Sequence, residues 1–204
     1  MKLILTRHGE TEWNRLRRTQ GSTDTQLTDK GREQARLLAD RLAGAGIDVI
    51  YASSLTRAME TAQIISSTIG APVVEEPNLK EYGFGIWEGQ AFDLLRDNFP
   101  EHFKVWQSTP ELSAIPDAEH FSDYSGRIQT FIHRLLQNHA GQTVLAVSHA
   151  LTSKLLITNG LGLPERYIHC FRVGNTSVNV LNFLSDKVVL ECLNDTTHLS
   201  GATI

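Results

Sequence analysis

Two arginines and two histidines in this sequence are placed where they could hold a phosphate group and attack it. Arg7 and His8 are adjacent and directly follow a short apolar run near the start of the chain, and Arg57 and His149 each follow a further apolar run. Guanidinium groups bind phosphate oxygens bidentately, and an imidazole near positive charge stays unprotonated and can act as a nucleophile. Each residue alone is more often a surface charge or a structural polar group, so the chemistry is inferred from the set.

Phosphoryl transfer assigns a separate task to each of these side chains. Its transition state spreads negative charge over three equatorial oxygens, with the attacking and leaving atoms in line. We expect Arg7 and Arg57 to clamp those oxygens, and His8 to attack phosphorus while its other ring nitrogen donates to a backbone carbonyl. A protonated His149 would stabilise the developing charge. The sequence contains no HExxH motif and no carboxylate cluster, so we expect neither a metal ion nor a cofactor.

The leaving oxygen also needs a proton, which a carboxylic acid near the mouth of the site could donate. Glu81 and Glu88 are the two candidates. Both lie in the glycine-spaced segment 79–89, where the backbone can approach a ligand closely. Spacing alone does not separate them.

Strand-like apolar runs and helical patterns alternate along the chain, as in proteins with a parallel sheet. The six runs are 3–6, 48–52, 72–75, 143–148, 177–183 and 187–193. Only three residues separate the last two runs, which indicates a hairpin and therefore one antiparallel strand. We predict an α/β fold, a three-layer α/β/α sandwich around a mostly parallel sheet. The strand ends beside Arg7, Arg57 and His149 would then share one edge of the sheet, where α/β proteins bind ligands.

Helices are expected between these strands. Thr28 and Ser54 are predicted N-caps of the first two helices, a third is expected near 122–139, and a fourth follows the fourth strand. The predicted inward residues are Ala35, Leu38, Ala39 and Leu42 in the first helix and Ile128, Phe131, Ile132, Leu135 and Leu136 in the third. The segment 78–121 is richer in Pro, Gly and aromatic residues, which predicts a helical lid over the active site within a single domain, 1–204.

Composition restricts the partners and the compartment. The 204-residue chain has a net charge of −4 and no run rich in Lys or Arg, so nothing favours a nucleic acid or a membrane as partner. No signal peptide or membrane-length apolar run is recognisable, and Cys170 and Cys192 form no CxxC pair, so we expect reduced thiols in a cytoplasmic protein. The expected partner is a small-molecule phosphate ester. The sequence leaves a monomer and a homodimer open.

Motifs in a fixed order along nearly the whole chain resemble the histidine phosphatase superfamily, in its phosphoglycerate-mutase-like branch. They comprise Arg7-His8-Gly9 with Glu10-Thr11-Glu12-Trp13-Asn14, Gln20-Gly21, Leu27-Thr28 through Gln34-Ala35, Ser53-Ser54-Leu55 through Thr61-Ala62, Glu81 with Trp87-Glu88-Gly89, Ser148-His149, and Asn194-Asp195 with His198-Leu199. Arg-His-Gly alone would be unspecific, but the combination is highly specific.

The resemblance implies a role for each candidate. His8 would form a phosphohistidine, and Arg7, Arg57 and His149 would complete the phosphate pocket. Glu81, rather than Glu88, would protonate the leaving oxygen and then activate the water that hydrolyses the intermediate. Further residues expected to bind phosphate or substrate are Asn14, Gln20, Gly21 and Ala150.

Two departures from the family pattern bear on the reaction. Mutases of this branch usually follow the acidic residue with Arg-His-Tyr, whereas Tyr82-Gly83-Phe84 stands here in a chain shorter than typical mutases. Asp117-Ala118-Glu119-His120 stands where phosphatases often have a Gly-Glu-Ser-like element, which leaves the substrate open.

We therefore predict a metal-independent phosphatase for small phosphorylated metabolites, with α-ribazole phosphate, phosphoserine and sugar phosphates all open. The alternatives are a phosphoglycerate mutase or bisphosphatase, and a catalytically dead module that binds a phosphorylated ligand.

Overall fold

One six-stranded sheet forms the centre of the computed structural model, which describes residues 1–110 and 114–200. The strands are β1 (Lys2–Arg7), β2 (Val49–Ala52), β3 (Val73–Glu75), β4 (Thr143–Ser148), β5 (Val178–Phe183) and β6 (Val188–Asp195). Their order across the sheet is β3-β2-β4-β1-β5-β6. The first four strands run parallel, and β5 is antiparallel to both of its neighbours. The predicted strands and the single reversed strand are confirmed.

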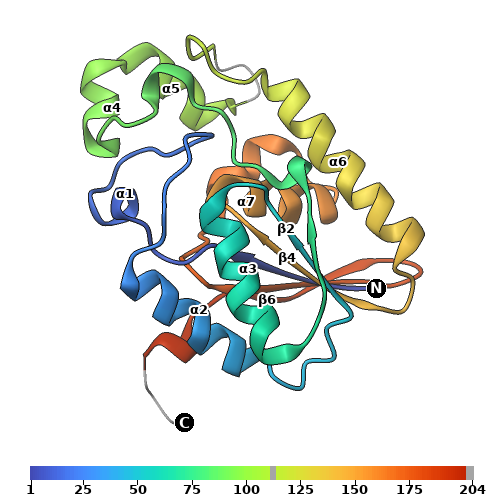
Figure 1. Ribbon diagram of the computed structural model, residues 1–204. Coiled ribbons are helices and arrows are strands. Elements are labelled where there is room, and N and C mark those ends of the chain that lie inside the picture. Colours follow the sequence, from blue (N-terminus) through green and yellow to red (C-terminus); the bar gives the residue numbers. More distant parts are fainter. Residues whose placement is uncertain (111–113, 201–204) are drawn as a thin grey trace.

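Helices connect the strands and cover both faces of the sheet (Figure 1). They are α1 (Glu12–Arg15), α2 (Asp29–Leu42), α3 (Thr56–Ile69), α4 (Phe92–Asn98), α5 (Pro100–Ser108), α6 (Phe121–Asn138) and α7 (Ala150–Gly160). Short 3₁₀ helices are η1 (Pro77–Leu79), η2 (Gly85–Trp87), η4 (Glu165–Cys170) and η5 (Thr197–Leu199). In the described part of the chain, no helix is both long and apolar enough to cross a membrane.

Alternate residues of the buried strands point into two separate cores, because side chains along a strand alternate between its faces. On one face, Ile4 and Leu145 pack with α2 and α3. On the other face, Leu3, Leu5 and Val144 pack with α6 and α7. A strand that is buried on both faces has a continuous run of apolar residues, which is why these strands could be predicted from the sequence. The predicted three-layer arrangement follows from these two cores.

The two predicted helix caps differ in outcome. Thr28 caps α2 as expected, and its hydroxyl oxygen accepts from the Gly31 N–H. Ser54 does not cap α3, which begins at Thr56. The Thr56 N–H instead donates to a carboxylate oxygen of Asp24 at 3.0 Å. An acidic side chain from a distant loop therefore replaces the local cap and brings residues 20–25 to the start of α3.

The inward face of α6 also differs from the prediction at one position. Ile128, Phe131 and Leu135 are buried as expected, but Leu136 is 40% exposed. Successive helical residues are about 100° apart, so the residue next to Leu135 falls outside the buried stripe.

The two short helices α4 and α5 lie together at one end of the molecule, near α1 (green in Figure 1). They hold their place through apolar side chains, with Leu95 of α4 and Trp106 of α5 almost fully buried. Trp106 stacks on Tyr82 with ring centroids 5.3 Å apart and meets Trp87 edge-on at 6.3 Å. This aromatic cluster joins α4 and α5 to the segment that contains Glu81.

Candidate active site

The carboxyl ends of β1, β2 and β4 meet at one edge of the sheet, as the sequence predicted. Arg7 at the end of β1 is in register with Ser148 at the end of β4, and the His8 N–H donates to the Ser148 carbonyl at 2.9 Å. His149 follows as the N-cap residue of α7, and Arg57 lies in the first turn of α3. The rings of His8 and His149 are 5.2 Å apart. All four predicted side chains are therefore brought together.

The hydrogen bonds of His8 fix which ring nitrogen is free. Its Nδ1 lies 2.7 Å from the Gly9 carbonyl oxygen, and a carbonyl only accepts, so Nδ1 carries the proton and Nε2 keeps its lone pair. His8 is 2% exposed. Burial lowers its pKa well below the ordinary value of about 6.5, and the positive charges of Arg57 and Arg7 lower it further. His8 is thus a neutral imidazole with a free Nε2, as a nucleophile must be.

Each of the two arginines makes some of its possible side-chain hydrogen bonds and leaves its Nε–H unbonded in the described part of the chain. Arg57 is buried, and its Nη1 and Nη2 donate to the carbonyls of Thr23 and Gly21 at 2.8 Å each. Burial lowers the pKa of Arg57 to about 10, so the guanidinium remains charged at neutral pH. Arg7 donates from Nη1 to the Val173 carbonyl at 3.4 Å. The buried Nε of each arginine has no partner among the described residues.

The second histidine is held by a serine. His149 Nε2 lies 2.8 Å from the Ser53 Oγ, which already accepts from the Leu55 N–H. We assign the Ser53 hydroxyl hydrogen to Nε2, which leaves the proton of His149 on Nδ1. The pKa of His149 is lowered well below its ordinary value, mainly by burial and next by the positive charge of Arg57. This direction favours a neutral ring, and a protonated His149 that stabilises developing charge stays a prediction.

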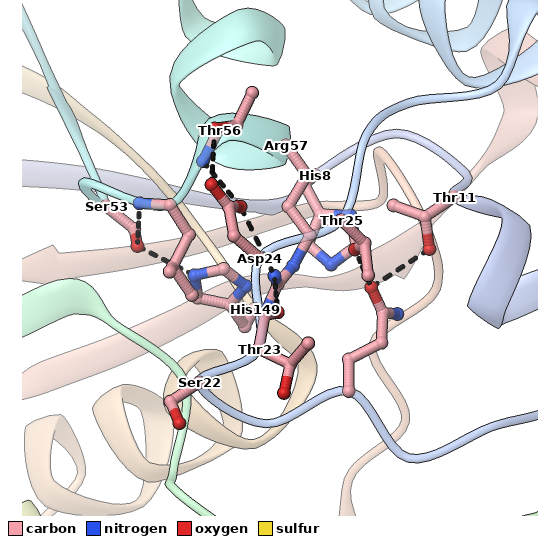
Figure 2. A network of polar contacts seen from close by, with 12 residues as sticks. His8, Thr11, Ser22, Thr23, Asp24, Thr25, Ser53, Thr56, Arg57 and His149 are labelled. Atoms are coloured by element: carbon pink, nitrogen blue, oxygen red, sulfur yellow. Dashed lines mark hydrogen bonds and ion pairs between the residues drawn. The ribbon is translucent and has the colours of Figure 1, made fainter. Parts of the chain in front are cut away.

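Three buried N–H donors thus lie around His8 without a partner in the part of the chain that the structure describes: Arg7 Nε, Arg57 Nε and His149 Nδ1. Buried donors are almost always hydrogen-bonded, so a group of them calls for an acceptor. Two of the three belong to guanidinium groups, which favours an anion. Figure 2 shows the surrounding network, in which Thr23 accepts from Arg57, Asp24 accepts from Thr56 at the start of α3, and Ser53 meets His149.

Glu81 and Glu88, which spacing could not separate, have different surroundings. Glu81 lines the cavity beside His8, and its carboxylate accepts from the Leu151 and Thr152 N–H groups at the start of α7, each at 3.0 Å. Glu88 is not among the cavity-lining residues and accepts from the N–H groups of Ser22 at 2.9 Å and Phe84 at 3.0 Å. Glu88 therefore links the loop that contains Ser22 to the loop that contains Phe84, whereas Glu81 faces the site.

The remaining predicted residues, Asn14, Gln20, Gly21 and Ala150, all line the same cavity. Gly21 has a φ of +59°, and a Cβ atom there would lie 2.1 Å from a Glu88 oxygen, so a larger residue would be strained and would displace the Glu88 side chain. The Gly21 carbonyl in turn accepts from Arg57. Asn14 Oδ1 accepts from the Asn175 side chain, which also donates to the His8 carbonyl.

Residues beyond the phosphate end of the cavity were mostly missed by sequence reasoning. The cavity has a volume of about 440 Å³, and its other lining residues are Arg17, Arg18, Thr19, Phe84, Trp87, Phe92, Leu95, Trp106, Leu151, Lys154, His169 and Asn175. Helical spacing could have found Lys154, which lies four residues after Ala150 on the same face of α7. His120 is exposed and lies outside this cavity.

Among the residues that the structure describes, no group of three or more His, Cys, Asp or Glu side chains is arranged to hold a metal ion. The groups that converge on His8 are instead cationic or N–H donors, a set suited to an anion.

Fold and site together define a class: α/β proteins with a buried cationic site, suited to an anion, at the carboxyl edge of the sheet. The family description that matches residues 3–196 is the histidine phosphatase superfamily, branch 1. This chain belongs to that family.

Individual relatives span both reaction types considered above. A curated relative from Enterobacter sp. (strain 638), named "Probable phosphoglycerate mutase GpmB", is 34% identical over 209 aligned residues, covering 100% of this chain and 97% of the relative. The structure of phosphoserine phosphatase from Entamoeba histolytica in complex with 3-phosphoglyceric acid is 35% identical, with a TM-score of 0.85 over 97% of this chain and 98% of that one. The α-ribazole phosphatase of Shigella flexneri is 32% identical, with a TM-score of 0.85 over 96% of each chain. The family and these neighbours support phosphatase activity.

Proposed function

We propose that this protein is a metal-independent phosphomonoesterase that hydrolyses small phosphorylated metabolites through a phosphohistidine on His8. The observation that carries the proposal is the cluster of buried, unpartnered N–H donors around a neutral imidazole whose Nε2 is free. Such a site combines electrostatic stabilisation with an activated nucleophile, and neither needs a metal ion.

In the first step, His8 Nε2 attacks the phosphorus atom while the phosphoryl oxygens accept from Arg7 Nε, Arg57 Nε and His149 Nδ1. The new N–P bond forms as the ester P–O bond breaks, and the electron pair of that bond goes to the leaving oxygen. Glu81 lines the same cavity and donates the proton that this oxygen requires. The products are an alcohol and phosphorylated His8.

In the second step, the Glu81 carboxylate takes a proton from a water molecule as that water attacks the phosphorus atom. The N–P bond breaks, its electron pair returns to Nε2, and inorganic phosphate leaves. The same carboxyl group therefore serves first as acid and then as base, and regains its starting proton.

Rapid-quench labelling with a radioactive phosphate ester tests this proposal. We expect an acid-labile, alkali-stable phosphoprotein from the wild type and no label on His8→Ala. His133→Ala is the matched control, because this exposed histidine of α6 lies outside the cavity, and it should label as the wild type does. A label that persists in His8→Ala would overturn the mechanism. Activity should also survive EDTA, and loss of activity in the chelator would overturn the metal-free claim.

The mutase alternative retains support from the relative named as a mutase. Incubation with 3-phosphoglycerate and 2,3-bisphosphoglycerate separates the two reactions, because a mutase must isomerise faster than it releases phosphate. We expect phosphate release to be faster. Tight binding of phosphate without turnover of any ester would instead indicate the binding module.

A further inference from the structure

The two oxygens of the Glu81 carboxylate have different hydrogen-bond partners. Oε1 accepts from the Tyr82 N–H at 3.2 Å, from the Thr152 N–H at 3.0 Å and from the Thr152 hydroxyl at 2.9 Å. Oε2 accepts from the Leu151 N–H at 3.0 Å and from no other described residue. A carboxylate oxygen has about two lone-pair sites, so three donors leave Oε1 no place for a proton. A neutral Glu81 therefore carries its proton on Oε2.

The same difference separates the side of the carboxyl group that faces the cavity from the side that faces the protein interior. Leu151, whose N–H meets Oε2, lines the cavity together with Glu81. Tyr82 and Thr152, which meet Oε1, are buried and are not among the lining residues. Oε2 is therefore the oxygen on the cavity side, where a leaving oxygen or a water molecule can reach it.

The Thr152 hydroxyl has one hydrogen and two acceptors at the same distance. Its Oγ1 lies 2.9 Å from Glu81 Oε1 and 2.9 Å from the Lys80 carbonyl oxygen. The Tyr124 hydroxyl donates to this Oγ1 at 3.1 Å, and burial raises the pKa of Tyr124 well above its ordinary value, so it remains a donor. The Thr152 hydrogen can therefore turn toward the carboxylate when Glu81 is ionised and toward the carbonyl when Glu81 is protonated.

We propose that Thr152 is a positioning residue for the acid–base step: its hydroxyl stabilises Oε1 of the ionised Glu81, and Oε2 alone gives and takes the proton. In the first step, the Oε2–H bond breaks as the proton moves to the leaving ester oxygen. In the second step, Oε2 takes a proton from the attacking water. This role rests on the proposed function, in which Glu81 is the acid and then the base.

Other charged or titratable groups also face Glu81. They are Arg7 and His8 at the end of β1, Arg57 of α3, Tyr124 and Arg127 of α6, and Lys154 of α7. The charged ones are unchanged in every variant below, so they act alike on the wild type and on the variants. A difference in pH dependence then reports the hydroxyl that was removed.

The pH dependence of kcat/KM with two substrates tests the role of Thr152. Propyl phosphate needs a proton on its leaving oxygen and p-nitrophenyl phosphate does not, so only propyl phosphate should lose activity as Glu81 ionises at high pH. Thr152→Val keeps the side-chain shape and the backbone N–H but removes the hydroxyl, which takes one hydrogen bond from the ionised carboxylate. We expect this alkaline limb to move upward by about one pH unit, and the profile with p-nitrophenyl phosphate to keep its shape.

Three further variants control for structural damage. Thr152→Ser keeps a hydroxyl and should return the limb to its wild-type position. Thr158→Val is the matched control, because Thr158 is equally buried in α7 but its hydroxyl donates to the Lys154 carbonyl at 2.9 Å, and the limb should not move. If Thr152→Val fails to fold because Tyr124 loses its acceptor, Thr152→Val/Tyr124→Phe removes both hydroxyls and should show the same upward shift.

The two ways to fail are distinct. An alkaline limb that stays in place when the Thr152 hydroxyl is absent would refute its positioning role and leave Glu81 as the acid. Wild-type profiles that are identical for the two substrates would instead refute Glu81 as the acid, and with it this part of the proposed function.

Discussion

At the scale of single residues, the site is organised by which hydrogen bonds its side chains already make and which they leave unmade. Arg57 uses Nη1 and Nη2 to hold the carbonyls of Gly21 and Thr23, and this fixes the direction in which its Nε points. His8 uses Nδ1 on the Gly9 carbonyl, and this frees Nε2. Contacts with the backbone therefore preorganise the groups that act on the ligand, which reduces the reorganisation needed during reaction.

Arg57→Lys should lower kcat/KM by about 100-fold. A lysine ammonium cannot bond both carbonyls in the fork geometry of the guanidinium and also present an Nε–H, and each bond to a charged group contributes about 1.5–3 kcal/mol. Steady-state kinetics on one phosphate ester measures the loss. Arg36→Lys, at an exposed position on α2, is the control and should keep full activity. An Arg57→Lys enzyme with unchanged kcat/KM would contradict the role given to Arg57.

Glu81→Gln should separate the two halves of the reaction. A p-nitrophenolate leaving group departs without a proton, so the first step with p-nitrophenyl phosphate should remain fast, whereas water activation should be slow. Stopped-flow absorbance should therefore show a burst of nitrophenolate close to the enzyme concentration, followed by a slow steady state. Alkyl phosphates, whose leaving oxygen needs the proton, should lose activity without a burst. Equal losses with both esters and no burst would refute the acid–base assignment.

The two buried histidines should make stability depend on pH. The pKa values of His8 and His149 are lowered in the folded protein, chiefly by burial, so both stay neutral there as the pH falls below about 6.5, while the unfolded chain takes up protons. The free energy of unfolding should therefore decrease between pH 7 and pH 5. Urea titrations measure it, and His149→Gln should show a smaller decrease than the wild type. An identical decrease in both proteins would disagree with a neutral, buried His149.

At the scale of elements, the start of α7 and the loop that carries Glu81 form one unit. Glu81 accepts from the Leu151 and Thr152 N–H groups at the start of α7. Arg127 of α6 stabilises the loop that carries Glu81, because it donates to the carbonyls of Asn78 and Lys80 at 2.6 and 2.8 Å. It also forms a two-bond ion pair with Glu119 at 2.8 and 2.9 Å.

Arg127→Met should therefore release the loop that carries Glu81. We expect kcat to fall at least tenfold with KM nearly unchanged, because Arg127 does not line the cavity, together with a loss of about 3 kcal/mol of stability from an unpaired, partly buried Glu119. Kinetics and thermal unfolding measure the two effects. Glu119→Gln, which retains an acceptor for Arg127, should show smaller changes in both. A raised KM with normal kcat would point to a role in binding instead.

Elements were more predictable from the sequence than the contacts between them. The strands were found because each is a continuous apolar run, and the cap of α2 because Thr28 stands directly before the helix. The start of α3 was misjudged because Asp24, which accepts from its first N–H, lies 32 residues earlier in the chain. Tertiary contacts of this kind leave no local signal in a sequence.

At the scale of the whole molecule, a chain with a net charge of −4 concentrates positive charge at one sheet edge. Parallel strands bring Arg7, Arg57 and His149 to that edge, so their convergence followed from topology alone. The shape of the cavity beyond these residues could not be predicted from topology, since it depends on how Trp106 of α5 packs against Trp87. The convergence of the cationic side chains therefore follows from the strand order, whereas the shape of the rest of the cavity follows from how α4 and α5 pack.

In the proposed mechanism, His8 Nε2 carries the phosphoryl group during turnover. Peptide mapping by mass spectrometry tests it most directly, on Glu81→Gln mixed briefly with p-nitrophenyl phosphate and digested at alkaline pH. We predict one phosphoryl group per chain, on the peptide that contains His8. A phosphoryl group on any other residue, or none on a variant that still releases nitrophenolate, would contradict the account.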